Sequence, residues 1–139
     1  MALSLGVDIF INARTDVYLH DLVADEKKVQ ETLDRAAVYR SAGADGLFVP
    51  GLTDTAHVAQ ITKGTDLPVN LMASPELPNA DGLAKLNVRR LSAGTALAQI
   101  AYKHVARLAE NFLRNGDCKV FNEDALQYSQ LQALFDSRD

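Results

Sequence analysis

Short apolar segments alternate with longer amphipathic segments four times along this chain. The short segments are rich in the β-branched and aromatic residues that favour strands, and they lie at residues 8–12, 44–49, 67–72 and 88–92. The first longer segment, at residues 25–43, has Val29, Leu33 and Ala36 at helical intervals. This alternation is typical of parallel strands joined by crossover helices. The pattern therefore predicts an α/β fold built on a parallel sheet.

Residues with capping preferences indicate where the helices begin and end. We expect Gly43 to end the first helix, and Thr53 to cap the second helix with Asp54 in its first turn. The longest helix is predicted at residues 94–114, before an Asn-Gly break, and a last helix is predicted to begin at Asn122. One apolar stripe follows the longest helix and contains Leu97, Ile100, Ala101, His104, Val105, Leu108 and Phe112.

The spacing of the predicted strands distinguishes between two α/β architectures. Each βα unit spans roughly 20 to 37 residues, the size found in a (β/α)8 barrel of about 250 residues. A doubly wound, flavodoxin-like sheet needs a Gly-rich or hydroxyl-rich phosphate loop after its first strand, and the string Asn-Ala-Arg-Thr-Asp at residues 12–16 is no such loop. We therefore predict half of a TIM (β/α)8 barrel, with four strands, over residues 1–116, and a helical extension over residues 117–139.

Composition and charge limit the cellular compartments and the classes of partner that we expect for this protein. The 139 residues are 47% hydrophobic, with a mean hydropathy of -0.07, as expected for a compact domain. The formal net charge of -4 leaves no basic surplus for nucleic acid or an anionic membrane, and no apolar run approaches the roughly 20 residues of a membrane span. The single cysteine, Cys118, cannot form an internal disulfide. We expect a cytoplasmic protein without nucleic-acid or membrane partners.

Four segments carry a family resemblance in their order and spacing. They lie at residues 10–16, 42–51, 67–70 and 88–94, and the Asn-Ala-Arg-Thr-Asp string is the most specific. Together they resemble the second half of the phosphoenolpyruvate mutase and isocitrate lyase superfamily. The resemblance implies a (β/α)8 barrel that binds Mg²⁺ and an α-keto or α-hydroxy acid at the strand ends, and that cleaves a C–C bond or moves a phosphoryl group. It also implies dimers or tetramers that exchange the last barrel helix.

The chain departs from the family pattern at several positions. The resemblance starts just before the family's fifth strand, whereas the family's magnesium ligands and mobile catalytic loop lie on earlier strands. Pro50 stands where lyases carry Glu, Asn70 lies about two residues early, and Thr95 aligns with a lyase Arg. The chain looks closest to the phosphonomutase-like bacterial branch. Only Asp16 offers a carboxylate at a strand end, so we predict no metal site, no catalytic residue and no turnover by the chain alone. The alternative is a catalytically silent oligomeric fragment or a small-anion-binding module.

Five residues are candidates for binding a small carboxylate or phosphonate. Arg14 ends a barrel-type strand and has the planar guanidinium that matches such anions. Asp16 is expected to be its ion-pair partner, and Asn12 points to the same side of the strand, either toward ligand or as an interior amide. Asn70 could bind a carboxylate or make a core hydrogen bond. Ser92, before the longest helix, could hold phosphate, although capping by residues 92–95 is the favoured interpretation.

Other polar residues are expected to be structural. His104 lies on the apolar stripe and is predicted to be a packed or interface histidine, whereas His20 and His57 are predicted at the surface. The adjacent Lys27 and Lys28 are predicted to form a solvated helix face. Half a barrel leaves two open sheet edges, which a soluble monomer tolerates poorly. We therefore predict a homo-oligomer, at least a dimer, with the longest helix or the strand edges at the interface.

Overall fold

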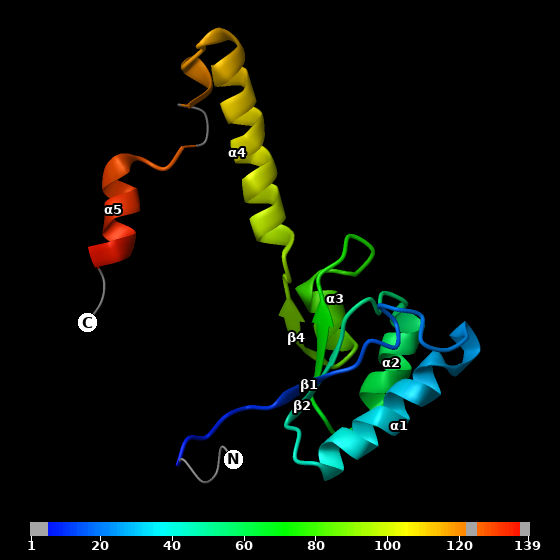
Figure 1. Ribbon diagram of the computed structural model, residues 1–139. Coiled ribbons are helices and arrows are strands. Elements are labelled where there is room, and N and C mark those ends of the chain that lie inside the picture. Colours follow the sequence, from blue (N-terminus) through cyan, green and yellow to red (C-terminus); the bar gives the residue numbers. More distant parts are fainter. Residues whose placement is uncertain (1–5, 122–124, 137–139) are drawn as a thin grey trace. The chain divides into compact units, whose positions relative to one another are not determined.

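The predicted parallel sheet is present in the computed structural model, which describes residues 6–121 and 125–136 (Figure 1). Its strands lie in the order β1 (Asn12–Arg14), β2 (Gly46–Val49), β3 (Val69–Met72) and β4 (Val88–Ser92), and every neighbouring pair is parallel. The crossover helices are α1 (Lys28–Ser41), α2 (Thr55–Gly64) and α3 (Ala80–Lys85). The predicted α/β class and the four βα units are therefore confirmed.

The hydrophobic core lies between the sheet and its crossover helices. Alternate residues of β2 and β3 face the helices and are almost completely buried, namely Leu47, Val49, Val69 and Leu71. They pack against Val58 and Ile61 of α2 and Ala36 of α1. Each buried aliphatic side chain contributes about 1.5–3 kcal/mol relative to leaving it exposed. The hydrophobic core therefore lies on one face of the sheet, and the crossover helices do not cover the opposite face.

The first strand is shorter and later than the sequence pattern predicts. Residues 8–12 were the expected strand, but β1 consists of Asn12–Arg14. The reason is the position of its neighbour, because the Ile11 carbonyl oxygen accepts hydrogen bonds from the backbone N–H groups of Asp45 and Gly46, where β2 begins. Asn12 and Arg14 consequently lie on the strand itself, with Arg14 as its last residue.

Two of the predicted caps are wrong and one is confirmed. The side chain of Asp54, rather than Thr53, caps α2 by accepting hydrogen bonds from the backbone N–H groups of the second and third residues after it. Thr95 precedes α4 (Ala96–Asn115) in a helical conformation, and its side chain makes no capping bond. The favoured capping role of residues 92–95 therefore fails. Gly43 follows α1 with a φ of 96°, as predicted, and Asn122 lies outside the described residues.

The residues up to Gly94 and those from Thr95 onward form two compact units. The second unit contains α4 and α5 (Tyr128–Asp136), and α4 ends at Gly116 in the left-handed conformation, as the Asn-Gly break predicts. The apolar stripe of α4 is exposed rather than buried, with 71% of Leu97 and 66% of Ile100 accessible. Over residues 6–121 and 125–136, no helix is both long and apolar enough to span a membrane.

Candidate anion-binding site

An ion pair stands at the carboxyl end of the first strand. The Nε atom of Arg14 donates a hydrogen bond to Oδ1 of Asp16 at 2.6 Å. Half of the Arg14 side chain is accessible, and its guanidinium carbon lies 5.9 Å from the ring centroid of Phe48. The acid and the aromatic ring therefore orient a guanidinium that remains open to solvent, at the edge of the sheet where barrel enzymes bind their ligands.

A row of side chains crosses the sheet from Arg14. The register pairs Arg14 with Phe48, Phe48 with Asn70, and Asn70 with Arg90, so these four residues share the face opposite the hydrophobic core. Asn70 is only 3% exposed, and its Oδ1 accepts a hydrogen bond from Oγ of Ser92 at 3.0 Å. Two of the predicted site residues, Asn70 and Ser92, are therefore directly bonded to each other.

The five candidate residues form two groups rather than one pocket, and Ser92 belongs to the first group through its hydrogen bond to Asn70. Asn12 and Asn70 line a small cavity of about 220 Å³ together with Phe10 and Arg90. Arg14 and Asp16 do not line that cavity and form the second group. Polar groups thus lie along the face of the sheet opposite the hydrophobic core, which we call the inward face.

Comparisons with known proteins identify the family of the chain. The family model described as phosphoenolpyruvate phosphomutase matches residues 1–113. The chain belongs to this family. Because the match includes all four strands and the Arg14–Asp16 pair, the phosphoenolpyruvate mutase and isocitrate lyase resemblance of the sequence is confirmed.

Relatives of the family share the fold over about half of their own length. A structure from Burkholderia cenocepacia J2315, provisionally named a phosphonomutase, is 44% identical with a TM-score of 0.74 over 79% of this chain and 45% of that chain. A provisionally named lyase/mutase from the same organism is 33% identical with a TM-score of 0.81 over 99% of this chain and 49% of that chain. The partial barrel predicted from the sequence is therefore confirmed.

Curated relatives are likewise longer than the matched region. An uncharacterized Mycobacterium tuberculosis protein is 39% identical over 103 residues, which are 72% of this chain and 38% of that protein. An oxaloacetate decarboxylase of Pseudomonas savastanoi pv. phaseolicola is 41% identical over 63 residues, 44% of this chain and 22% of the decarboxylase. The chain thus spans well under half the length of these two relatives.

Magnesium, the metal implied by the phosphoenolpyruvate phosphomutase family, does not fit the side chains described. Asp16 is already bound to Arg14, and Asp45 lies before β2, where its carboxylate accepts the Ile11 N–H at 2.8 Å. Within residues 6–121 and 125–136, no three His, Cys, Asp or Glu side chains gather as a ligand set. Mg²⁺ needs near-octahedral oxygen ligands, and two occupied carboxylates at opposite strand ends do not supply them.

A polar cluster that sequence reasoning missed supports the loop after Arg14. Lys28 is not solvated as predicted, because its side chain is only 11% exposed and its Nζ lies 2.5 Å from Oδ1 of both Asp21 and Asp25. Nζ also lies 5.6 Å from the ring centroid of Tyr18. The Asp25 to Lys28 spacing, three residues apart at the start of a helix, was the available signal. Lys28 therefore ties the loop that follows β1 to helix α1.

The same cluster joins the loops that follow β1 and β2. The Tyr18 hydroxyl lies 3.2 Å from Nδ1 of His57, which is half-buried rather than at the surface as expected. Burial raises the pKa of Tyr18 to about 12. Backbone N–H donors, first from His57, hold the pKa of Asp54 below its ordinary value, and Lys28 does the same for Asp25. The carboxylates of Asp21, Asp25 and Asp54 each already have a partner. The cluster therefore stabilises the loops that follow β1 and β2.

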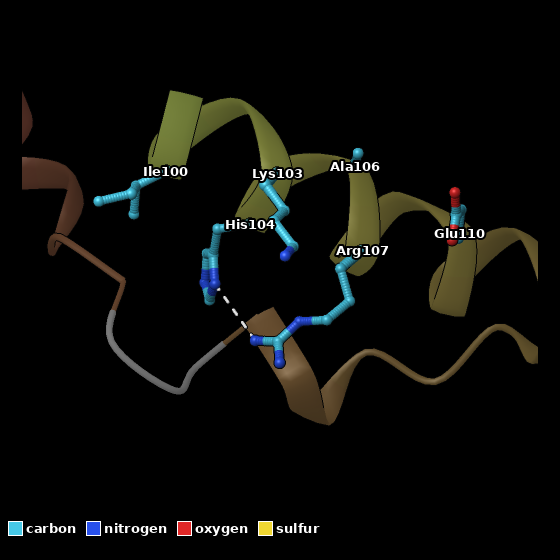
Figure 2. Close-up of a pocket in the computed structure, with 6 residues that line it drawn as sticks. All are labelled: Ile100, Lys103, His104, Ala106, Arg107 and Glu110. Carbon is cyan, nitrogen blue, oxygen red and sulfur yellow. Dashed lines mark hydrogen bonds between the residues drawn. The ribbon is translucent and has the colours of Figure 1, made fainter. Parts of the chain in front are cut away.

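His104 is the remaining candidate that the structure places differently from expectation. It is exposed on α4 rather than packed, and Nδ1 lies 3.2 Å from Nη2 of Arg107 (Figure 2). The two side chains line a hollow of about 490 Å³ whose lining residues all belong to α4. Figure 2 shows the Lys103 side chain on the same side of the helix as His104 and Arg107. This hollow is a groove on one helix rather than an enclosed site.

Proposed function

We propose that this chain supplies the substrate-anion subsite of a phosphoenolpyruvate phosphomutase-type enzyme that acts on a small α-keto or α-hydroxy acid in the cytoplasm. The observation that carries the proposal is the half-exposed guanidinium of Arg14 at the carboxyl end of β1. The relatives of the chain include proteins named oxaloacetate decarboxylase, phosphonomutase and lyase/mutase. The proposed reaction class is C–C cleavage or phosphoryl transfer, the two kinds of reaction that these names indicate.

The geometry of Arg14 supports recognition of a carboxylate or phosphonate. Asp16 accepts from Nε, and the hydrogen bonds described for Arg14 leave its two Nη atoms available to a ligand. A charge-assisted hydrogen bond of this kind contributes about 1.5–3 kcal/mol. Phe48 holds the flat side of the guanidinium. The chain alone is proposed to bind the anion without turnover, because the described residues include no ligand set for the magnesium that this reaction class needs.

Binding of two probe anions tests this function directly. Isothermal titration with oxalate and phosphonoacetate should give saturable binding to the wild-type chain and at least about tenfold weaker binding to Arg14→Gln. Arg35→Gln is the matched control, since Arg35 pairs with Glu31 on the surface of α1. Equal affinities of the wild type and Arg14→Gln would contradict the subsite. Magnesium-dependent oxaloacetate cleavage that Arg14→Ala abolishes would instead make the chain an enzyme by itself.

A second proposal concerns assembly. We propose that two or more copies of the chain associate through α4, which would also suit the alternative of a catalytically silent oligomeric fragment. The supporting observation is the stripe of exposed apolar side chains on this helix, including Leu97, Ile100, Val105 and Phe112. Stripes of this kind on isolated helices usually cover another apolar surface.

A further inference from the structure

We propose that Tyr18 and His57 are positioning residues of the anion subsite, because the hydrogen bond between them fixes the turn that carries Asp16. Arg14 itself is bonded to Asp16 and lies against the ring of Phe48, so Tyr18 and His57 act on it through the turn. This role rests on the proposed function, since the property that the two residues would set is the affinity of Arg14 for an anion.

Asp16 both holds Arg14 and begins a tight turn of the chain. Its side-chain Oδ1 accepts the hydrogen bond from Nε of Arg14, and its carbonyl oxygen accepts one from the backbone N–H of His20 at 3.0 Å. A second bond, from the N–H of Leu22 to the carbonyl oxygen of Val17 at 3.1 Å, closes the same segment. We call this segment, from Asp16 to Leu22, the Asp16 turn. A rotation of the Asp16 turn would move the carboxylate that orients the guanidinium.

The two residues that follow Asp16 hold the Asp16 turn in different ways. Val17 is completely buried, but apolar burial is not directional, so it does not set the rotation of the turn. The hydroxyl of Tyr18, in contrast, lies 3.2 Å from Nδ1 of His57, and the two rings meet edge to face with their centroids 6.0 Å apart. Hydrogen bonds are directional, so this contact fixes the rotation of the Asp16 turn.

His57 is a rigid partner because of its place in α2. It lies in the first turn of the helix, where its backbone N–H donates to Oδ1 of Asp54 at 3.1 Å. The next residue, Val58, is completely buried in the hydrophobic core, and the imidazole is itself half-buried. Side chains on a helix hold a site more precisely than side chains on loops. His57 therefore ties the Asp16 turn to a rigid element.

The ring and the hydroxyl of Tyr18 can be tested separately. Nζ of Lys28 lies 5.6 Å from the ring centroid, and the Tyr18 side chain also packs against the hydrophobic core. Tyr18→Phe keeps both contacts and removes only the bond to His57. His57→Leu removes the bonding partner, whereas His57→Asn keeps a polar side chain that can bond the Tyr18 hydroxyl. A positioning role therefore predicts different results for the two His57 variants.

Titration calorimetry with oxalate measures the effect on the subsite. We expect Tyr18→Phe and His57→Leu each to weaken binding about threefold to tenfold, which corresponds to the loss of one ordinary hydrogen bond. The double variant should bind about as well as either single variant, because both changes remove the same bond. His57→Asn should keep most of the affinity. Tyr39→Phe, the same change near the other end of α1, is the matched control and should bind like the wild type.

A second measurement needs no ligand. The Nε–H of Arg14 bonds to Asp16, and nuclear magnetic resonance measures how fast this proton exchanges with water. Tyr18→Phe should speed the exchange at least about threefold, and Tyr39→Phe should leave it unchanged. If the wild type does not bind oxalate, the proposed function fails, and the exchange rate still decides whether Tyr18 holds the Arg14–Asp16 pair.

Three results would overturn the positioning role. The first is wild-type oxalate affinity, or wild-type exchange at Arg14, in the Tyr18→Phe variant. The second is a pair of losses that add in the double variant, which would mean that Tyr18 and His57 act separately. The third is a His57→Asn variant that binds as weakly as His57→Leu. Circular dichroism checks that each variant folds like the wild type, so that a loss of affinity is not a loss of structure.

Discussion

The Cα of Gly51 lies so close to the backbone of Leu19 that a Cβ built on Gly51 would be 2.8 Å from both the Cα and the N atom of Leu19. Gly51 also has a φ of 82°, a conformation that L side chains rarely adopt. The contact holds the loop after β2 against the loop after β1, and this second loop contains Asp16, the ion-pair partner of Arg14. Glycine at position 51 therefore allows the close packing of the two loops that positions the proposed subsite.

Replacing Gly51 should therefore affect both stability and ligand binding. We expect Gly51→Ala to lower the free energy of unfolding by about 1–3 kcal/mol, through backbone strain and the clash with Leu19, and to weaken oxalate binding. Urea denaturation and titration calorimetry measure the two effects. Gly43→Ala is the matched control, because Gly43 has a φ of 96° but a Cβ at that position would meet nothing within 4 Å. Equal costs for the two variants would show that the Leu19 contact contributes nothing.

Lys28 should make stability depend on acid pH. Its hydrogen bond holds the pKa of Asp25 below the ordinary value. An acid with a lowered pKa contributes stability that is present above its unfolded pKa of about 4 and is lost as the pH falls through the folded value. The stability advantage of the wild type over Lys28→Met should therefore be largest near neutral pH and shrink below about pH 4.

Denaturation of wild type and Lys28→Met between pH 7 and pH 3 measures this effect. Lys27→Met is the control, since Lys27 is exposed and has no ion pair within the described residues. The difference in the free energy of unfolding between Lys27→Met and the wild type should stay constant from pH 7 to pH 3. A Lys28→Met difference that does not change with pH would contradict the role of Lys28 as the partner of Asp25.

Neighbouring residues of β2 should respond differently to truncation because they point to opposite faces. Leu47 is completely buried against the crossover helices, so Leu47→Ala should cost about 2–5 kcal/mol. Phe48 is only partly buried on the inward face, so Phe48→Ala should cost about 1 kcal/mol in the chain alone. Urea denaturation of both variants checks the assignment. A larger cost for Phe48→Ala would mean that the inward face is already covered.

Patterns local in sequence predicted the fold well. Short apolar runs between amphipathic segments located β2, β3 and β4, and Gly43 located the end of α1, because these features depend on local composition and backbone preference. The start of β1 was misplaced, since pairing with Gly46 decides which residues of an extended segment become a strand. Strand pairing acts between residues far apart in sequence, so a local pattern does not contain it.

The polar cluster was missed for a related reason. Lys28 looks solvated beside Lys27, and only the folded loop brings Asp21 and Asp25 to its Nζ atom. Arg14 and Asp16 were identified because they lie two residues apart on one side of a strand, so their contact is local.

The proposed association through α4 predicts a specific effect of placing a charge on its apolar stripe. Ile100 is 66% exposed and lies on that stripe. If copies of the chain bury it, Ile100→Asp should convert an oligomer of at least two 15.1 kDa chains into a monomer, as measured by light scattering at micromolar concentration. Gln99→Asp, with the same charge on the opposite side of α4, should leave the mass unchanged.

Thermal unfolding gives an independent readout of the same association. When folding is coupled to association, mass action raises the unfolding midpoint as protein concentration increases. We expect this dependence for the wild type and for Gln99→Asp, and its loss for Ile100→Asp. A wild-type mass of 15.1 kDa together with a midpoint independent of concentration would exclude self-association through α4. The α4 stripe would then have to cover a surface other than a second copy, since exposed apolar area of this extent favours burial.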